Sequence, residues 1–423
     1  MLSRIAMKLK VILAALLISG FPAVAVPAPP APSPDGSTLK KIDKAALQAM
    51  VDKTARELMV PGALVLLRTP EGDFTVSYGT TELGTDSTPT AGTHFRIASN
   101  TKTITAALIV LLAEEGKLKL DDPVSKYVAN VPNGDKITIT DLLDMRSGLY
   151  NYTNAPELSE SMDKDPARAH TPADLLAIAF KRPPDFQPGA EYEYNNTNYA
   201  LLGLIIEKAA AKPLAEVMRE RLFGPLGMKE TYLPASGDIT LPEPYAHGYG
   251  YGSVATVLTD DEPYPPDIVA AARAGTLNPT DFTGVNHSFA WAAGGAISTA
   301  NDMATWIEAL VSGKVLDAEY QRKWSGSFKP QDPDKPHGQE YGYGMVRLSW
   351  GPNTIYFHGG ETVGYNSKIS YDPGNRATLI IWTTLSVSLD GQQPANTLMV
   401  NVLDQIYEVS PLAAPPADSK SGQ

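Results

Sequence analysis

The chain has 423 residues, of which 43% are hydrophobic and 19% are charged, a composition that suits a globular protein with a sizeable core and excludes wholesale disorder. Its formal net charge of −12 argues against binding nucleic acid or an anionic lipid surface through a basic face. The chain has no cysteine, which excludes disulfides, a thiolate nucleophile, a cysteine-ligated metal and a lipid-modified cysteine.

Residues 1–25 have the pattern of a signal peptide. A short basic segment precedes an apolar stretch that begins at Val11 and ends in a small-x-small sequence, which predicts cleavage after Ala25. The basic residues of this segment are Arg4, Lys8 and Lys10. Their removal would change the net charge from −12 to −15. The protein is therefore expected to be exported, as a periplasmic, cell-wall-associated or secreted protein; an uncleaved N-terminal anchor and a start at Met7 are the alternatives.

Low-complexity segments flank a single expected domain. Residues 26–37 are rich in Pro and Ala and predict a flexible spacer. Residues 411–423 have a similar composition and predict a disordered tail. This tail has no apolar run, so we expect no C-terminal membrane anchor. Residues 38–410 are expected to form the folded domain.

Within this domain, strand patterns lie near both ends and helix patterns lie in the middle. A helix is predicted over 40–59, followed by strands at 63–68 and 74–78. Later strands are predicted at 343–349, 354–357, 368–371 and 377–384, before a closing helix at 396–407. The helices predicted between these two groups are 101–115, 139–145, 172–180, 199–210 and 213–222.

This order predicts an α/β (α+β) fold. One mostly antiparallel sheet is built from both chain ends and flanked by helices, and a helical lobe is inserted beside it. A cleft between the edge of the sheet and the lobe is the expected place for a site.

The first candidate site is a Ser-x-x-Lys sequence at the start of an apolar helix. Ser99 and Lys102 are three residues apart, so on a helix their side chains share a face. A serine hydroxyl becomes a good nucleophile when a neighbouring base takes its proton, and a buried, neutral lysine can be that base. The alternative is that Ser99 only caps the helix.

Two other Ser-x-x-Lys matches start at Ser37 and Ser161. The first follows the Pro-rich spacer and is interpreted as a helix cap, and the second is expected in a polar, charged loop. Because neither precedes a long buried helix, Ser99 is the favoured nucleophile.

The second candidate site is a Tyr-x-Asn sequence, Tyr194 to Asn196, before the helix predicted near residue 200. A phenol there could relay protons, and an amide could hold a substrate carbonyl or amide. Ordinary turn and cap chemistry of Asn is the alternative. A competing match, Tyr152 to Asn154, has no predicted helix behind it, so we favour Tyr194.

The third candidate is the strand at 354–360, which ends in His358, Gly359 and Gly360. Glycines let another chain approach the backbone closely, and a strand edge can pair with a peptide-like substrate. The alternative is a plain turn.

The order of these three sequences resembles the serine β-lactamase and penicillin-binding-protein superfamily. More narrowly, it is similar to the branch with class C β-lactamases, D-alanyl-D-alanine carboxypeptidases, D-aminopeptidases and related esterases. The segments 141–149 and 293–303 also resemble this branch, so the resemblance covers residues 40–408.

The resemblance implies a role for each residue. Ser99 would be the acylated nucleophile and Lys102 its base, while Tyr194 would pass protons to the leaving group. Asn196 would bind the acyl-side amide. The backbone N–H groups of Ser99 and Glu361 would form the oxyanion hole. No metal or organic cofactor is implied.

His358 departs from the β-lactamase sequence, which has Lys at this place. A histidine is largely uncharged near neutral pH, so efficient β-lactamase activity is not expected. We consider that a His358 cation anchors a substrate carboxylate, or that His358 is neutral and donates a hydrogen bond. Glu361 adds a negative charge that could repel a carboxylate or attract an amine.

The favoured function is an exported serine hydrolase that acts through an acyl-enzyme, most similar to D-alanyl-D-alanine carboxypeptidases. An esterase, a D-aminopeptidase and a non-catalytic penicillin-recognising protein are the alternatives. The six histidines lack metal-site spacing, and Gly-x-Ser-x-Gly is absent, which disfavours a metallohydrolase and an α/β-hydrolase. The expected partner is a small-molecule or peptide-like substrate such as a cell-wall peptide, and the oligomeric state is left open.

Overall fold

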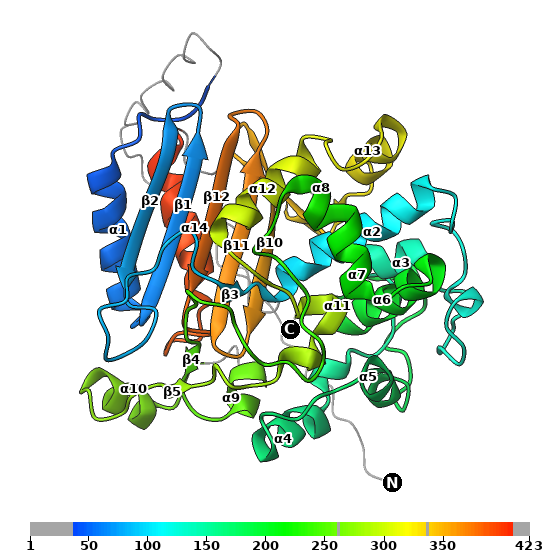
Figure 1. Ribbon diagram of the computed structural model, residues 1–423, viewed down its shortest axis with the longest axis horizontal. Coiled ribbons are helices and arrows are strands. Elements are labelled where there is room, and N and C mark those ends of the chain that lie inside the picture. The colour runs from blue at the N-terminus through cyan, green and yellow to red at the C-terminus, as the bar shows by residue number, and fades with distance from the viewer. Residues whose placement is uncertain (1–36, 260–262, 336–337, 409–423) are drawn as a thin grey trace, which may run out of the picture.

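An eight-stranded sheet forms the centre of the fold in the computed structural model, which describes residues 37–259, 263–335 and 338–408 (Figure 1). The strand order is β2-β1-β12-β11-β10-β9-β8-β7, and every pair is antiparallel. The strands are β1 Gly62–Thr69, β2 Gly72–Gly79, β7 Lys329–Pro330, β8 Glu340–Tyr341, β9 Val346–Trp350, β10 Asn353–Thr362, β11 Tyr365–Asp372 and β12 Ala377–Thr383. Two short antiparallel pairs lie outside this sheet: β3 Phe95–Arg96 with β6 Ile297–Ser298, and β4 Tyr249–Gly250 with β5 Thr280–Asp281.

The two ends of the domain meet in the middle of the sheet. Strand β1 pairs with β12, so that Val65 lies opposite Ile381. All residues of β11 and β12 are buried. This burial of both faces follows from helices that cover the sheet on each side. The prediction of one sheet built from strands near both ends of the domain is confirmed.

Helices pack against both faces of the sheet. Helices α1 (Lys44–Glu57) and α14 (Pro394–Ile406) contact each other on one face, while α12 (Ala300–Val311) packs on β11 and β12 from the other (Figure 1). Asn366 of β11 accepts a hydrogen bond from the Ala395 N–H of α14 at 2.9 Å. The side chains on the same face of β11 as Asn366 therefore point toward α14.

The helical lobe lies beside the β10 side of the sheet (Figure 1). Its central helix, α2 (Thr101–Glu114), is buried along nearly its whole length and contacts α6 (Asn196–Ala210) and α11 (Trp291–Gly294). The other helices are α3 Ile139–Leu143, α4 Pro156–Lys164, α5 Pro172–Ala179, α7 Leu214–Met218, α8 Gly224–Leu226, α9 Val254–Thr259, α10 Pro266–Arg273 and α13 Ala318–Ser325. Shorter turns are the 3₁₀ helices η1 Ala98–Asn100, η2 Val124–Lys126, η3 Tyr152–Asn154 and η5 His287–Phe289, and the π-helix η4 Arg219–Phe223.

Several predicted boundaries differ from the structure. Helix α1 begins at Lys44, because Asp43 caps it by accepting from the N–H groups of the next turn. Ser37 therefore caps no helix, and Ser161 lies on α4 and not in a loop. The strand expected to end at Gly360 continues to Thr362.

The predicted signal peptide, the spacer up to residue 36 and the predicted tail lie outside the described residues. In the part of the chain that the structure describes, no helix combines the length and the apolar character needed to cross a bilayer.

Candidate active site

Ser99 lies in the tight turn η1, directly before α2. The preceding residue, Ala98, has a φ of +49°, a left-handed conformation that is rare for a residue with a side chain. Asn100 fixes this turn by donating from Nδ2 to the Ile97 carbonyl at 2.9 Å and to the Ser367 hydroxyl at 2.8 Å. The turn therefore presents a partly exposed Ser99 to a cavity between the sheet and the lobe.

Lys102 is fully buried and its Nζ has three partners. It lies 2.9 Å from Ser99 Oγ, 2.7 Å from Asn196 Oδ1 and 2.8 Å from the Ala293 carbonyl oxygen. Among the described residues, Lys102 forms no ion pair with a carboxylate. Burial lowers the pKa of Lys102 well below its usual value.

These partners fit a neutral amine. The Asn196 and Ala293 oxygens only accept, so they take the two N–H groups of a neutral lysine. The nitrogen lone pair is then directed at the third partner, the Ser99 hydroxyl, which can donate its proton. The site thus places a base beside the hydroxyl, which is the arrangement that nucleophilic serine chemistry needs.

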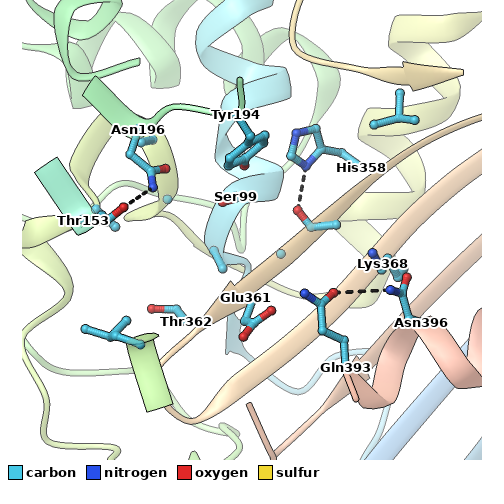
Figure 2. A pocket seen from close by; sticks show the side chains of 18 of the residues that line it. Ser99, Thr153, Tyr194, Asn196, His358, Glu361, Thr362, Lys368, Gln393 and Asn396 are labelled. Atoms are coloured by element: carbon cyan, nitrogen blue, oxygen red, sulfur yellow. Dashed lines mark hydrogen bonds between the residues drawn. The ribbon is translucent and has the colours of Figure 1, made fainter. Parts of the chain in front are cut away.

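Tyr194 also lies next to Ser99, in the loop before α6 (Figure 2). Its side chain interacts with Ser99, and Lys102 Nζ lies 4.7 Å from the centre of its ring. Burial raises the pKa of Tyr194 above its ordinary value, and the interaction with Ser99 opposes this shift only in part. Tyr194 is therefore a protonated phenol at neutral pH, which can donate a proton next to Ser99.

Asn196, the first residue of α6, joins Lys102 to the loop around η3. Its Nδ2 donates to Thr153 Oγ1 at 3.0 Å (Figure 2). Its backbone N–H donates to Asn151 Oδ1 at 3.1 Å. The amide oxygen is already engaged by Lys102. Asn196 therefore positions the lysine in this structure. For Asn196 to donate to a substrate as predicted, its hydrogen bond to Thr153 would have to break.

Strand β10 forms the opposite wall of the cavity. Residues 353–357 pair with β9, whereas residues 358–362 pair only with β11 among the described strands. A Cβ on Gly360 would lie 2.2 Å from the Ile97 carbonyl oxygen and 2.7 Å from Asn100 Nδ2. Glycine at this place lets the strand approach the turn that carries Ser99.

Both ring nitrogens of His358 are bound within the protein. Nδ1 lies 2.6 Å from the Gly359 carbonyl oxygen and Nε2 lies 3.2 Å from the Tyr341 hydroxyl. Because the carbonyl can only accept, Nδ1 carries the proton and Nε2 accepts from Tyr341. Burial, with nearby Lys102 and Lys368, lowers the pKa of His358 to about 3. His358 is therefore neutral at physiological pH, and the hypothesis of a carboxylate-anchoring cation does not fit this geometry.

The cavity between these walls has a volume of about 140 Å³. It brings together seven of the eight residues predicted from the sequence, and the eighth, Lys102, contacts two of them, Ser99 and Asn196. The seven that line the cavity are Ser99, Tyr194, Asn196, His358, Gly359, Gly360 and Glu361. No group of three or more His, Cys, Asp or Glu side chains that could hold a metal is found in the described residues.

Comparison with known proteins assigns the family. The family described as Beta-lactamase matches residues 48–404, most of the chain. The chain belongs to the beta-lactamase family. Its fold and the order of its motifs are those of the β-lactamase and penicillin-binding-protein superfamily.

Relatives in the family are similar at low identity. A putative penicillin-binding protein of Bacillus subtilis is 27% identical over 69% of this chain and 62% of its own length. A D-aminopeptidase of Brucella anthropi is 25% identical over 78% and 57%. A D-alanyl-D-alanine-carboxypeptidase/endopeptidase of Escherichia coli is 33% identical over 38% and 42%. The chain thus spans less than two thirds of the length of these curated relatives.

Solved structures confirm the fold. A D-stereospecific amidohydrolase from Streptomyces sp. is 27% identical with a TM-score of 0.71, covering 84% of this chain and 97% of that one. A D-amino acid amidase from Ochrobactrum anthropi SV3, complexed with L-phenylalanine amide, is 27% identical with a TM-score of 0.71 over 85% and 97%. The predicted α/β fold of the beta-lactamase family is confirmed.

The other sequence matches lie apart from Ser99 or make different contacts. Ser37 is bound to Asn375, and Ser161 does not line the cavity. Tyr152, from the competing Tyr-x-Asn sequence, does line it, but its hydroxyl donates to the Phe289 carbonyl at 2.7 Å. Its side chain is fully buried.

Sequence reasoning missed several residues of the cavity. Thr153 accepts a hydrogen bond from Asn196, and the Tyr341 hydroxyl is hydrogen-bonded to His358. Lys368, Gln393 and Asn396 line the end of the cavity next to α14 (Figure 2). A signal was present for Lys368, because it is a lysine on a strand that was expected in the central sheet, where lysine is rare.

Proposed function

We propose that the chain is an exported peptidase that hydrolyses peptide-like amide bonds through an acyl-enzyme on Ser99, as a D-alanyl-D-alanine carboxypeptidase does. The observation that carries the proposal is the 2.9 Å contact between Ser99 Oγ and the Nζ of a buried Lys102 whose other two partners only accept. Export rests on the sequence of residues 1–25.

In the proposed acylation step, Lys102 takes the Ser99 proton as Oγ attacks the substrate carbonyl carbon. The negative charge that develops on the carbonyl oxygen is held by the backbone N–H groups of Ser99 and Glu361. One such donor typically contributes about 3 kcal/mol to the transition state. Tyr194 gives its phenolic proton to the leaving nitrogen and regains one from Lys102 as the C–N bond breaks. Water then releases the acyl group by the reverse proton transfers.

The open edge of β10 supports a peptide-like substrate. Its backbone groups between residues 358 and 362 can pair with an extended chain laid along the cavity. An ester would need only the nucleophile and the oxyanion donors, so ester hydrolysis is expected as a side activity.

A second candidate is hydrolysis of D-amino-acid amides or D-aminopeptidase activity. Glu361 lines the cavity, and a carboxylate there would favour a substrate ammonium. The similarity to D-aminopeptidase and D-amino acid amidase proteins supports this candidate.

The test is a panel of substrates with the purified chain and its Ser99→Ala variant. The panel contains an N-acyl-D-Ala-D-Ala peptide, D-alanine amide, a short-chain nitrophenyl ester and a fluorescent penicillin. The proposal expects release of D-Ala from the peptide and a covalent adduct on Ser99 seen by mass spectrometry. Turnover of the D-amino-acid amide alone would favour the second candidate. A penicillin adduct without turnover of any substrate would indicate a binding protein.

A further inference from the structure

Lys368 reaches the cavity by crossing over Gly359. The two residues lie opposite each other on β11 and β10. A Cβ on Gly359 would lie 2.5 Å from Lys368 Nζ and 3.2 Å from its Cε. The absence of a side chain at residue 359 therefore makes room for this lysine to extend toward the cleft.

The surroundings of Lys368 suit a bound anion. The residue is only 7% exposed, and a charge-assisted hydrogen bond is stronger where water is largely excluded. Two amide side chains of the α14 start, Gln393 and Asn396, line the same end of the cavity, and Gln393 Oε1 accepts from Asn396 Nδ2 at 3.4 Å (Figure 2). Since His358 is neutral, Lys368 is the one cationic side chain among the described residues that line this cavity.

We propose that Lys368 is a specificity-determining residue that binds the C-terminal carboxylate of the substrate. This assignment rests on the proposed acyl-enzyme function and deepens it, because it selects peptides whose leaving group is a single amino acid with a free carboxylate. Gln393 and Asn396 would offer further hydrogen bonds to the same group.

The spacing along β10 agrees with this substrate. Gly359 and Glu361, whose N–H is the proposed oxyanion donor, are two residues apart, which is about 6.6 Å along a strand. In a substrate, one residue beyond the scissile carbonyl spans about 3.5 Å. A charge-assisted hydrogen bond adds about 2.8 Å. A carboxylate one residue after the scissile bond can therefore reach the ammonium, whereas an internal peptide bond has no charge at that place.

Glu361 supplies a second, opposite test. It lies two residues from Gly359 on the same face of β10 and also lines the cavity. Its carboxylate repels a substrate carboxylate and competes for the lysine. Removing this charge should therefore raise the preference for acidic substrates, while removing the Lys368 charge should lower it.

The experiment compares kcat/KM for N-acyl-D-Ala-D-Ala with kcat/KM for the same peptide ending in a carboxamide. The enzymes are the wild type, Lys368→Met, Lys368→Arg, Glu361→Gln and the control Lys53→Met, a lysine that is 75% exposed on α1. We expect Lys368→Met to lower the acid-to-amide ratio about 10- to 100-fold, the range of a charge-assisted hydrogen bond. Lys368→Arg should keep most of the ratio, Glu361→Gln should raise it and Lys53→Met should leave it at the wild-type value.

The outcomes separate this inference from the function on which it rests. An equal loss for acid and amide in Lys368→Met, in a protein that melts like the wild type, would overturn the carboxylate assignment. The assignment also fails if the wild type cleaves acid and amide equally well, although Ser99-dependent hydrolysis would then still support the proposed function. If Lys368→Met does not fold, the acid-to-amide ratios of the other two variants test the assignment. An unchanged ratio in Glu361→Gln together with a strongly lowered ratio in Lys368→Arg would then overturn it. Failure of the proposed function itself would appear as no Ser99-dependent turnover of any substrate.

Discussion

The two adjacent glycines of β10 should respond very differently to alanine. Neither has a positive φ, so alanine can adopt both backbone conformations and only the space around the Cβ matters. At Gly360 the new Cβ would lie 2.2 Å from the Ile97 carbonyl oxygen, about 1 Å or more inside an ordinary contact. At Gly359 it would meet the end of a flexible side chain, Lys368, at 2.5 Å.

The expected magnitudes follow from these distances. In Gly360→Ala, β10 and the turn that carries Ser99 must separate by about 1 Å. Overpacking of this kind costs about 1–3 kcal/mol of unfolding free energy, and a 1 Å displacement of a reacting group can cost about 10²-fold in rate. In Gly359→Ala the lysine can move aside, so we expect a change below about 1 kcal/mol.

Urea unfolding followed by tryptophan fluorescence measures the first quantity, and hydrolysis of a neutral nitrophenyl ester measures the second. The ester is used because it lacks the carboxylate that Lys368 is proposed to bind. If Gly360→Ala and Gly359→Ala unfold at the same urea concentration and Gly360→Ala hydrolyses the ester at the wild-type rate, the close approach of strand and turn does not constrain the site.

Three further predictions concern Ser99 and the residues around it. Ser99→Ala should lower kcat on the order of 10³-fold or more for every substrate, with Ser161→Ala as the matched control that keeps wild-type rates. The wild-type kcat/KM should fall as pH falls through the lowered pKa of Lys102, because only the neutral amine can accept the serine proton. His358 should stay neutral with its proton on Nδ1 from pH 5 to 8, which ¹⁵N NMR of the ring reports, because its pKa is about 3.

Lys102 also links stability to pH. Its pKa is lower in the folded protein than in the unfolded chain, so between these two values the unfolded chain binds more protons. Stability therefore rises with pH in that window and is lost as pH falls. Lys102→Met should be inactive, yet should melt at a higher temperature than the wild type at neutral pH and lose that pH dependence. A lower melting temperature for Lys102→Met would mean that the three hydrogen bonds of the lysine outweigh its burial.

The sequence predicted a sheet built from strands near both ends of the domain, because these strands have a clear local pattern. It also predicted the Ser99 and Lys102 pair, since three residues on one helix are neighbours whatever the rest of the fold does. Tyr194 and the β10 residues were candidates from their local sequence, and the family resemblance supplied their roles. Their positions around Ser99 depend on contacts across the whole chain and not on local spacing.

The remaining site residues depend on register and tertiary contacts. Lys368 meets Gly359 only because β10 and β11 pair with one particular register, which a single sequence does not fix. Tyr341 is joined to His358 by a hydrogen bond that needs both segments in place. Helix α12 was missed although Thr299 and Asp302 form a local start signal, with the Thr299 side chain accepting from the Asp302 N–H.

The pairing of β1 with β12 has a consequence for how the chain folds. Val65 and Ile381 are partners although most of the domain lies between them. Contacts of such high sequence separation form slowly, since a long loop must close before they can stabilise the structure. Strand β1 can pair early with β2, but its other neighbour, β12, is synthesised only in the last part of the domain. A chain cut before Ala377 would leave β1 and β11 each without a neighbour on one side, so the central sheet cannot be completed until β12 has been synthesised.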